Sequence, residues 1–174
     1  MAKVKGTLEA QARATAILNA AIKDPALLNE IGEAVVRDIK GQTRTGKSLP
    51  TEDRFKPLTD GWIERRREIK AAGGTSNVFS PGRSNLTVTG QLIDSVKHFL
   101  NRGTVQIEAS GPRSPYQYKT KDGEVKTIPT DLDNATLSKY VSVDRPFIGL
   151  RAEMRERVVR IAQAFLRRAL RARR

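Results

Sequence analysis

The chain has 174 residues, of which 38% are hydrophobic, enough to bury one core but little more. It contains no cysteine, which excludes disulfides, thiolate metal ligands and a cysteine nucleophile. Its formal net charge of +13 predicts an anionic partner, and nucleic acid, an acidic protein or an anionic membrane would each fit. With material for one core, we expect a single domain over residues 1–174. No stretch approaches the roughly 18 uninterrupted apolar residues of a membrane span, and we expect no membrane partner.

The first part of the chain predicts two helices. Residues 1–24 predict an N-terminal helical extension with mostly small apolar side chains. A second helix is expected to start at Asp24-Pro25, because the carboxylate can cap it and proline at the first helical position loses no hydrogen bond. Gly41 predicts the end of this helix.

Residues 42–57 have no sustained hydrophobic period and predict a loop-rich segment. Thr59 then predicts the cap of a third helix, which is expected to end at Gly73-Gly74.

The segment Leu86–Val96 predicts a short capped helix. Thr89 is placed to cap it, and Gly90 and Leu92 fall in its first turn. This helix leads directly into the clearest hairpin signal of the chain, so we expect the two together to form a folding centre.

The hairpin is predicted from Val96–Leu100 and Thr104–Ala109, which flank a turn at Asn101-Arg102-Gly103. In the second strand Val105, Ile107 and Ala109 alternate with polar residues, which indicates a half-buried strand.

Residues 110–144 predict a second loop-rich segment. Within it, Tyr116–Tyr118 and Val125–Ile128 could flank a turn. Val141 and Val143 suggest a last short strand.

From Gly149 onward, apolar residues recur at helical spacing and predict an amphipathic closing helix. The chain from Arg151 to its end carries nine arginines against two glutamates. A candidate face for an anionic partner lies opposite the apolar side, at Arg160, Arg167, Arg171 and Arg174. Ordinary solvation of a charged helix face remains an equally good interpretation.

Two features that could indicate an enzyme are better explained otherwise. Gly41–Ser48 fits the phosphate-binding pattern of two spaced glycines followed by Lys-Ser, but a helix precedes it and Pro50 interrupts any helix that follows. His98 is the only histidine and has no cysteine or second histidine to assist it. We therefore expect no enzymatic activity, no catalytic residue, no metal site and no cofactor.

Three segments, in this order, resemble the phage virion-morphogenesis and tail-completion proteins: Phe55-Lys-Pro-Leu-Thr59, Leu86–Val96, and Arg145-Pro-Phe-Ile-Gly-Leu150 before the final helix. The resemblance covers roughly Ala26 to the C-terminus. It implies an α+β fold with a twisted antiparallel sheet packed by several helices and a long basic C-terminal helix. It also implies a structural role at the head–tail junction or the top of a phage tail.

This resemblance implies several partners. The first is the protein itself, in a homo-oligomeric ring; others are further neck and tail proteins, and DNA in the channel, contacted non-specifically. The protein would be made in the host bacterial cytoplasm and reside in the virion. The alternative is a free basic nucleic-acid-binding protein, which the charge favours but for which no known binding motif is present. An NTPase, resting on the glycine loop alone, is the third candidate.

Structural or interface roles are expected for seven residues. Pro146 fixes φ, Phe147 supplies a buried anchor, and Gly149 permits the turn into the last helix. Arg145 could pair with a carboxylate at the edge of the fold or on a neighbouring subunit. Whether these residues hold the last helix in place or contact a partner directly stays open. The other three, Thr89, Gly90 and Leu92, belong to the short helix predicted within Leu86–Val96.

Overall fold

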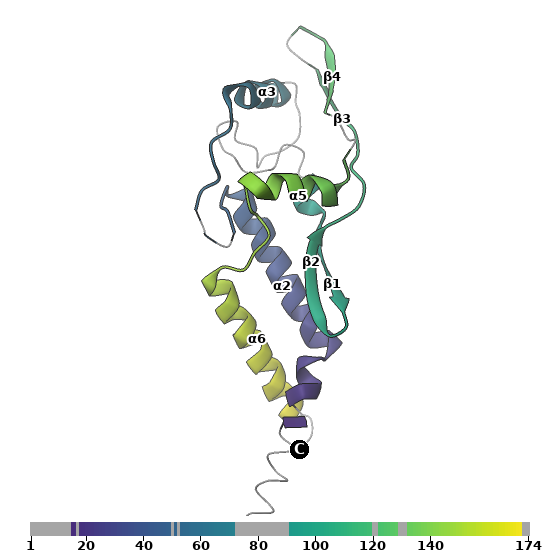
Figure 1. Ribbon diagram of the computed structural model, residues 1–174, viewed down its shortest axis with the longest axis vertical. Helices are drawn as coiled ribbons and strands as arrows, with labels where there is room; N and C mark the ends of the chain where they lie inside the picture. The colour runs from purple at the N-terminus through teal and green to yellow at the C-terminus, as the bar shows by residue number, and fades with distance from the viewer. Residues whose placement is uncertain are drawn as a thin grey trace, which may run out of the picture.

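The computed structural model confirms the α+β fold and the long basic C-terminal helix, with a central helix between two other layers (Figure 1). This is α2 (Pro25–Arg44), which contacts the hairpin of β1 (Val96–Asn101) and β2 (Thr104–Ala109) and also contacts α6 (Ala152–Arg171). The ribbon shows α6 and the hairpin on opposite sides of α2. The structure describes residues 15–16, 18–49, 51, 53–71, 91–119, 122–128 and 132–171.

The remaining elements lie toward one end of this layered body (Figure 1). Helix α4 (Gln91–Asp94) leads into β1, and α5 (Asn134–Asp144) contacts both α4 and β2. Strands β3 (Tyr116–Lys119) and β4 (Val125–Ile128) form a second two-stranded antiparallel sheet, as predicted, and β3 also contacts α3 (Asp60–Ala71).

Helix α2 begins where the sequence predicts but ends later. The Asp24 carboxylate accepts a hydrogen bond of 2.8 Å from the Ala26 backbone N–H, so it caps the helix as expected. The predicted stop at Gly41 is wrong, because an exposed glycine inside a helix costs only about 1 kcal/mol. The left-handed position that ends a helix is supplied instead by Gly46, with φ of +83°. Its N–H and that of Lys47 bond back to the last turn, which completes a Schellman motif.

The segment between α2 and α3 is irregular, as predicted for most of residues 42–57, but residues 42–44 belong to α2. It is not peripheral, because Leu49 and Phe55 are buried in the core. An isolated bridge pairs Lys47 with Arg54 and holds the loop closed.

The β1–β2 hairpin has the predicted turn. Arg102 and Gly103 have φ of +47° and +79°, which is the backbone of the two-residue turn that matches strand twist. The register pairs Val96 with Ala109 and Asn101 with Thr104, so Asn101 ends the strand instead of starting the turn. Strand β1 is therefore one residue longer than expected, whereas β2 has the predicted bounds.

Close contact between α2 and the hairpin depends on Gly32. A Cβ at this position would lie 2.4 Å from the ring of His98, a distance that atoms do not adopt. Glycine thus permits the helix to approach β1, and His98 fills the space as a packed side chain that reaches Asn29 at 3.1 Å.

The short strand predicted at Val141 and Val143 is wrong, since both residues belong to helix α5. The alternation of valines misled because Val141 packs against the core while Val143 is 83% exposed, and the fully buried positions of α5 are the polar Asn134 and Ser138. Asn134 donates from its backbone and its side chain to the carbonyl oxygen of Gly111, both at 3.1 Å. Polar contacts of this kind carry no hydrophobic period that a sequence could reveal.

Asp133 caps α5 with its carboxylate, which accepts a 2.7 Å hydrogen bond from the Thr136 backbone N–H. That bond lowers the pKa of Asp133 below its ordinary value. The cap therefore stabilises the helix at neutral pH, and this contribution is lost as the pH falls through the lowered pKa.

The core joins residues from every layer. Its fully buried side chains include Phe147 between α5 and α6, Leu49 in the loop, and Ile93 at α4. Met154 of α6 and Ile39 of α2 complete the cluster across the helix pair.

We expect Phe147→Ala to lower the free energy of unfolding by about 3–5 kcal/mol, because a fully buried aromatic ring leaves a cavity when truncated. Phe99→Ala is the matched control, since the same residue type is 40% exposed there, and it should lower the free energy of unfolding much less. Urea denaturation of both variants measures the difference. Equal losses would show that the Phe147 ring is not part of the core.

Candidate functional site

The junction between α5 and α6 holds the residues of the strongest resemblance. The Pro146 carbonyl oxygen accepts two hydrogen bonds, from the Leu49 backbone N–H at 2.8 Å and from the Ser48 hydroxyl at 3.0 Å. Phe147 is fully buried, as predicted, and Gly149 is half-buried. Two hydrogen bonds to one backbone carbonyl therefore hold the junction against the loop that follows α2. The hydrophobic pattern of the sequence does not predict them.

Arg145 lies at the edge of this junction and is half-buried. Its Nη2 donates to the carbonyl oxygen of Pro57 at 3.4 Å, which links the end of α5 to the segment before α3. Nearby, Lys56 and Asp144 form an exposed ion pair at 3.2 Å. Both contacts tie residues 56–57 to the end of α5.

The described part of the segment Leu86–Val96 contributes to the same core. Leu92, Ile93 and Val96 are all buried and belong to one cluster with Phe55 and Phe147. Thr89 and Gly90 lie outside the described residues. The three segments that carry the resemblance thus meet at one place in the fold.

A clamp that the sequence did not reveal holds the start of α6. Arg151 donates to both carboxylate oxygens of Asp38 on α2, from Nη2 at 2.7 Å and from Nε at 2.9 Å. The two side chains are 20% and 8% exposed, so the pair is largely desolvated. Arg151 also contacts Glu153. Such a bidentate pair fixes orientation as well as distance, but its partners are far apart in sequence and share no motif.

The predicted arginine face lies on the solvent side of α6. Arg160, Arg167 and Arg171 follow at a spacing that places them along one stripe of a helix, and all three are exposed. We call these three residues the arginine stripe; Arg174 lies outside the described residues. Within the described ranges, the only carboxylate in ion-pair contact with the stripe is Glu156, 3.9 Å from Arg160. The stripe is therefore largely uncompensated.

Arg168 behaves differently from the stripe. It pairs with Glu30 of α2 at 2.8 Å and lies over the Phe165 ring, 5.8 Å from its centroid. This arginine helps to hold α6 on α2, whereas the stripe faces away from the fold.

The glycine loop does not have the geometry of a phosphate site. Gly41 to Arg44 are helical, and the next backbone N–H groups are already used inside the chain. Those of Gly46 and Lys47 bond to the end of α2, and that of Ser48 bonds to Asp53 at 2.7 Å. These amides are not directed at a common anion, as phosphate binding requires.

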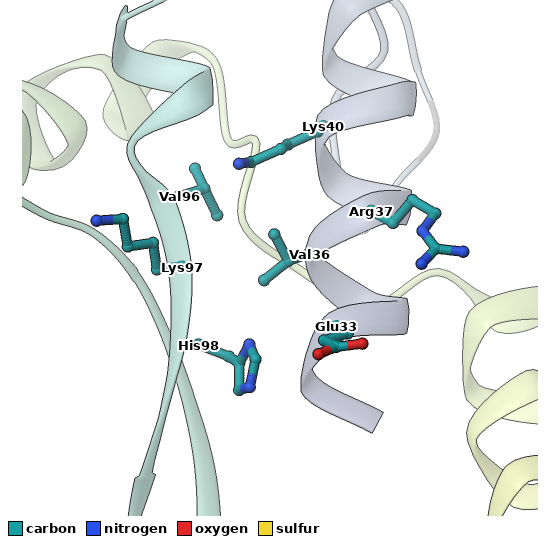
Figure 2. Close-up of a pocket in the computed structure, with 7 residues that line it drawn as sticks. All are labelled: Glu33, Val36, Arg37, Lys40, Val96, Lys97 and His98. Atoms are coloured by element: carbon teal, nitrogen blue, oxygen red, sulfur yellow. The ribbon is translucent and has the colours of Figure 1, made fainter. Parts of the chain in front are cut away.

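A groove of about 500 Å³ lies between α2 and β1 (Figure 2). Positive side chains outnumber negative ones along it. Its lining residues are Glu33, Val36, Arg37, Lys40, Val96, Lys97 and His98.

Nothing among the described residues suggests a metal centre, because no three His, Asp or Glu side chains gather in a suitable cluster there. In the same part of the chain, no helix combines the length and the apolar character needed to cross a membrane.

No family model matches the chain, and neither does any curated protein or solved structure. Function must therefore be inferred from residues and geometry. Of the expected site residues, the structure brings Leu92 and Phe147 together and leaves the arginine stripe on a separate surface. Asp38, Arg151 and Ser48 were missed, because their contacts are long-range and polar.

A double-mutant cycle should show that the Asp38–Arg151 clamp stabilises the fold. We expect Asp38→Ala and Arg151→Ala each to lower the free energy of unfolding by about 2–3 kcal/mol, because one leaves Arg151 only its contact with Glu153 and the other leaves the largely buried Asp38 carboxylate without Arg151. The exposed pair Lys56–Asp144 is the matched control, with a coupling energy of about 0–1 kcal/mol. Similar coupling energies for the two pairs would contradict a special role for the clamp.

Proposed function

We propose that the protein is a structural subunit of a phage virion, at the head–tail junction or the top of the tail, and acts by assembling into a homo-oligomeric ring. One observation carries the proposal. The three segments that resemble the tail-completion proteins, far apart in sequence, pack into one core around Phe55, Ile93 and Phe147. The resemblance therefore falls on residues that help to form the core, as expected if these segments determine the fold.

The distribution of exposed apolar side chains supports self-assembly. Tyr140 and Val143 are exposed on α5, while Val159 and Leu170 are exposed on α6. A closed ring uses two different surfaces of each subunit, one for each neighbour. Exposed apolar residues on these two elements are compatible with that requirement.

The arginine stripe supports contact with an anionic partner in such an assembly. Its charges have few intramolecular partners and lie along more than two turns of one helix. DNA in the channel and acidic surfaces of other neck or tail proteins would both attract it. In this role the protein works by stoichiometric binding and not by catalysis.

The same stripe favours a second candidate, a free basic nucleic-acid-binding protein. The two differ in how DNA would be bound. The structural role requires only phosphate contacts, so binding by the isolated chain should be non-specific and fall steeply with salt. A sequence-specific footprint that persists at high salt would favour the second candidate.

Phage complementation tests the proposal directly. A phage that lacks this gene should accumulate unjoined heads and tails, visible by negative-stain electron microscopy, and the wild-type chain should restore particles. The variant with glutamine at Arg160, Arg167, Arg171 and Arg174 should fold normally, because glutamine is a good helix former, yet it should not restore joining.

A matched pair isolates the stripe from total charge. Arg167→Gln with Arg171→Gln should impair joining, whereas Arg155→Gln with Lys139→Gln, two exposed cations away from the stripe, should not. Normal particle yield from the quadruple variant would reduce the stripe to ordinary solvation. Complete particles without the gene would contradict the proposed function itself.

A further inference from the structure

The groove between α2 and β1 combines an apolar floor with a positive rim (Figure 2). Val36 and Val96 point into the space between the helix and the strand. Lys40 reaches from α2 toward the strand, whereas the side chains of Arg37 and Lys97 point outward on either side of the groove, and Glu33 is its one carboxylate (Figure 2). A ligand that fits both the apolar floor and these positive margins offers apolar groups together with negative charge.

One wall of the groove is an open strand edge. The Ser95 carbonyl oxygen accepts a hydrogen bond from the Ser110 N–H at 3.3 Å, which fixes which residues turn their backbone groups toward β2. Because these groups alternate along an antiparallel strand, those of Val96, His98 and Leu100 point to the opposite edge. Within the described part of the chain, no backbone hydrogen bond uses that edge.

The open edge of β1 begins just after a backbone carbonyl that already accepts a hydrogen bond from a lysine side chain. Lys40 donates from Nζ to the Asp94 carbonyl oxygen at 3.0 Å, immediately before β1 starts. Beyond this point the edge runs along the groove with its donors and acceptors available. An exposed strand edge of this kind is a template for a further strand.

We propose that this edge and groove bind an extended acidic segment of another protein by strand addition. Backbone hydrogen bonds to Val96, His98 and Leu100 would continue the β1–β2 sheet, as in other cases of strand addition. Side chains on one face of the added strand would lie beside Val36, and those on its other face would lie on the side of β1 that carries Lys97. Apolar residues fit the first face and carboxylates fit the second. The inference goes beyond the ring and does not depend on it.

Charge argues for a different protein as the occupant. A second copy of this chain carries a further +13 and has no evident acidic strand to offer, since β4 contains Lys126 and β2 only one glutamate, Glu108. The two longer stretches outside the described residues, 1–14 and 72–90, contain one carboxylate between them, Glu9. The chain therefore cannot readily supply an acidic strand to its own groove.

Synthetic peptides test the mode of binding. The probe is a fluorescein-labelled ten-residue peptide of alternating valine and glutamate, titrated with the full-length chain and followed by anisotropy. It should bind, whereas the same peptide with lysine in place of glutamate should not. A version with N-methyl groups on alternate amides should also fail, because it cannot form the ladder. Equal binding of the methylated peptide would exclude strand addition.

Charge reversal tests the location. Lys97→Glu should weaken peptide binding several-fold, because an exposed ion pair is lost and becomes repulsive. Arg160→Glu is the matched control, with the same charge change on the arginine stripe. Equal weakening by both variants would show that the peptide is held by net charge and not by the groove.

Proline tests the edge itself. Leu100→Pro removes a backbone donor on the open edge of β1 and none from the β1–β2 ladder, so it should abolish peptide binding. Val105→Pro, which acts on the outer edge of β2, should leave binding intact. Circular dichroism checks that both variants fold, and the charge-reversal pair decides the matter if they do not.

Light scattering on the same samples separates this inference from the proposed ring. Peptide binding should be lost in Leu100→Pro while the oligomeric state is kept. Loss of self-association in that variant, with no peptide binding by wild type, would identify the edge as a contact between copies and overturn the proposal. A monomeric wild type that still binds the acidic peptide would sink the ring alone.

Discussion

The backbone N–H of Leu49 donates to the carbonyl oxygen of Pro146, and this contact places the loop after α2 against the junction between α5 and α6. Leu49, the donor, and Phe147, which follows the acceptor, are both fully buried. The hydrogen bond therefore forms inside the core, where an unpaired donor would be costly. The Asp38–Arg151 clamp then sets how α6 leaves the junction. The direction of α6, and with it the arginine stripe, follows from these few contacts.

Local signals predicted the fold where a few adjacent residues determine the backbone. Asp24 caps α2, and Arg102-Gly103 forms the hairpin turn, because capping and positive φ are properties of short stretches. Helix α5 was missed because the polar Asn134 and Ser138 occupy its fully buried positions and interrupt the apolar period on the side that meets the core. The prediction that α2 ends at Gly41 was wrong because glycine permits the end of a helix but does not require it.

The candidate site was predicted only in part, for a physical reason. Burial of Leu92 and Phe147 follows from hydrophobicity next to turn residues, and exposure of the arginine stripe follows from helical spacing. The Asp38–Arg151 clamp and the open edge beside the groove depend on which elements meet in space. No local pattern in the sequence shows which helices and strands meet in the fold.

Exposed apolar side chains occur on several elements of this protein, and those on α5 and α6 underlie the proposed ring. The arginine stripe faces away from the core, whereas exposed apolar residues such as Tyr140 and Leu170 lie on two different helices. Native mass spectrometry of the purified full-length chain over a range of concentrations measures the outcome most directly. The proposed role predicts one closed oligomer of fixed mass. A monomer at every concentration, or an open-ended series of oligomers, would contradict it.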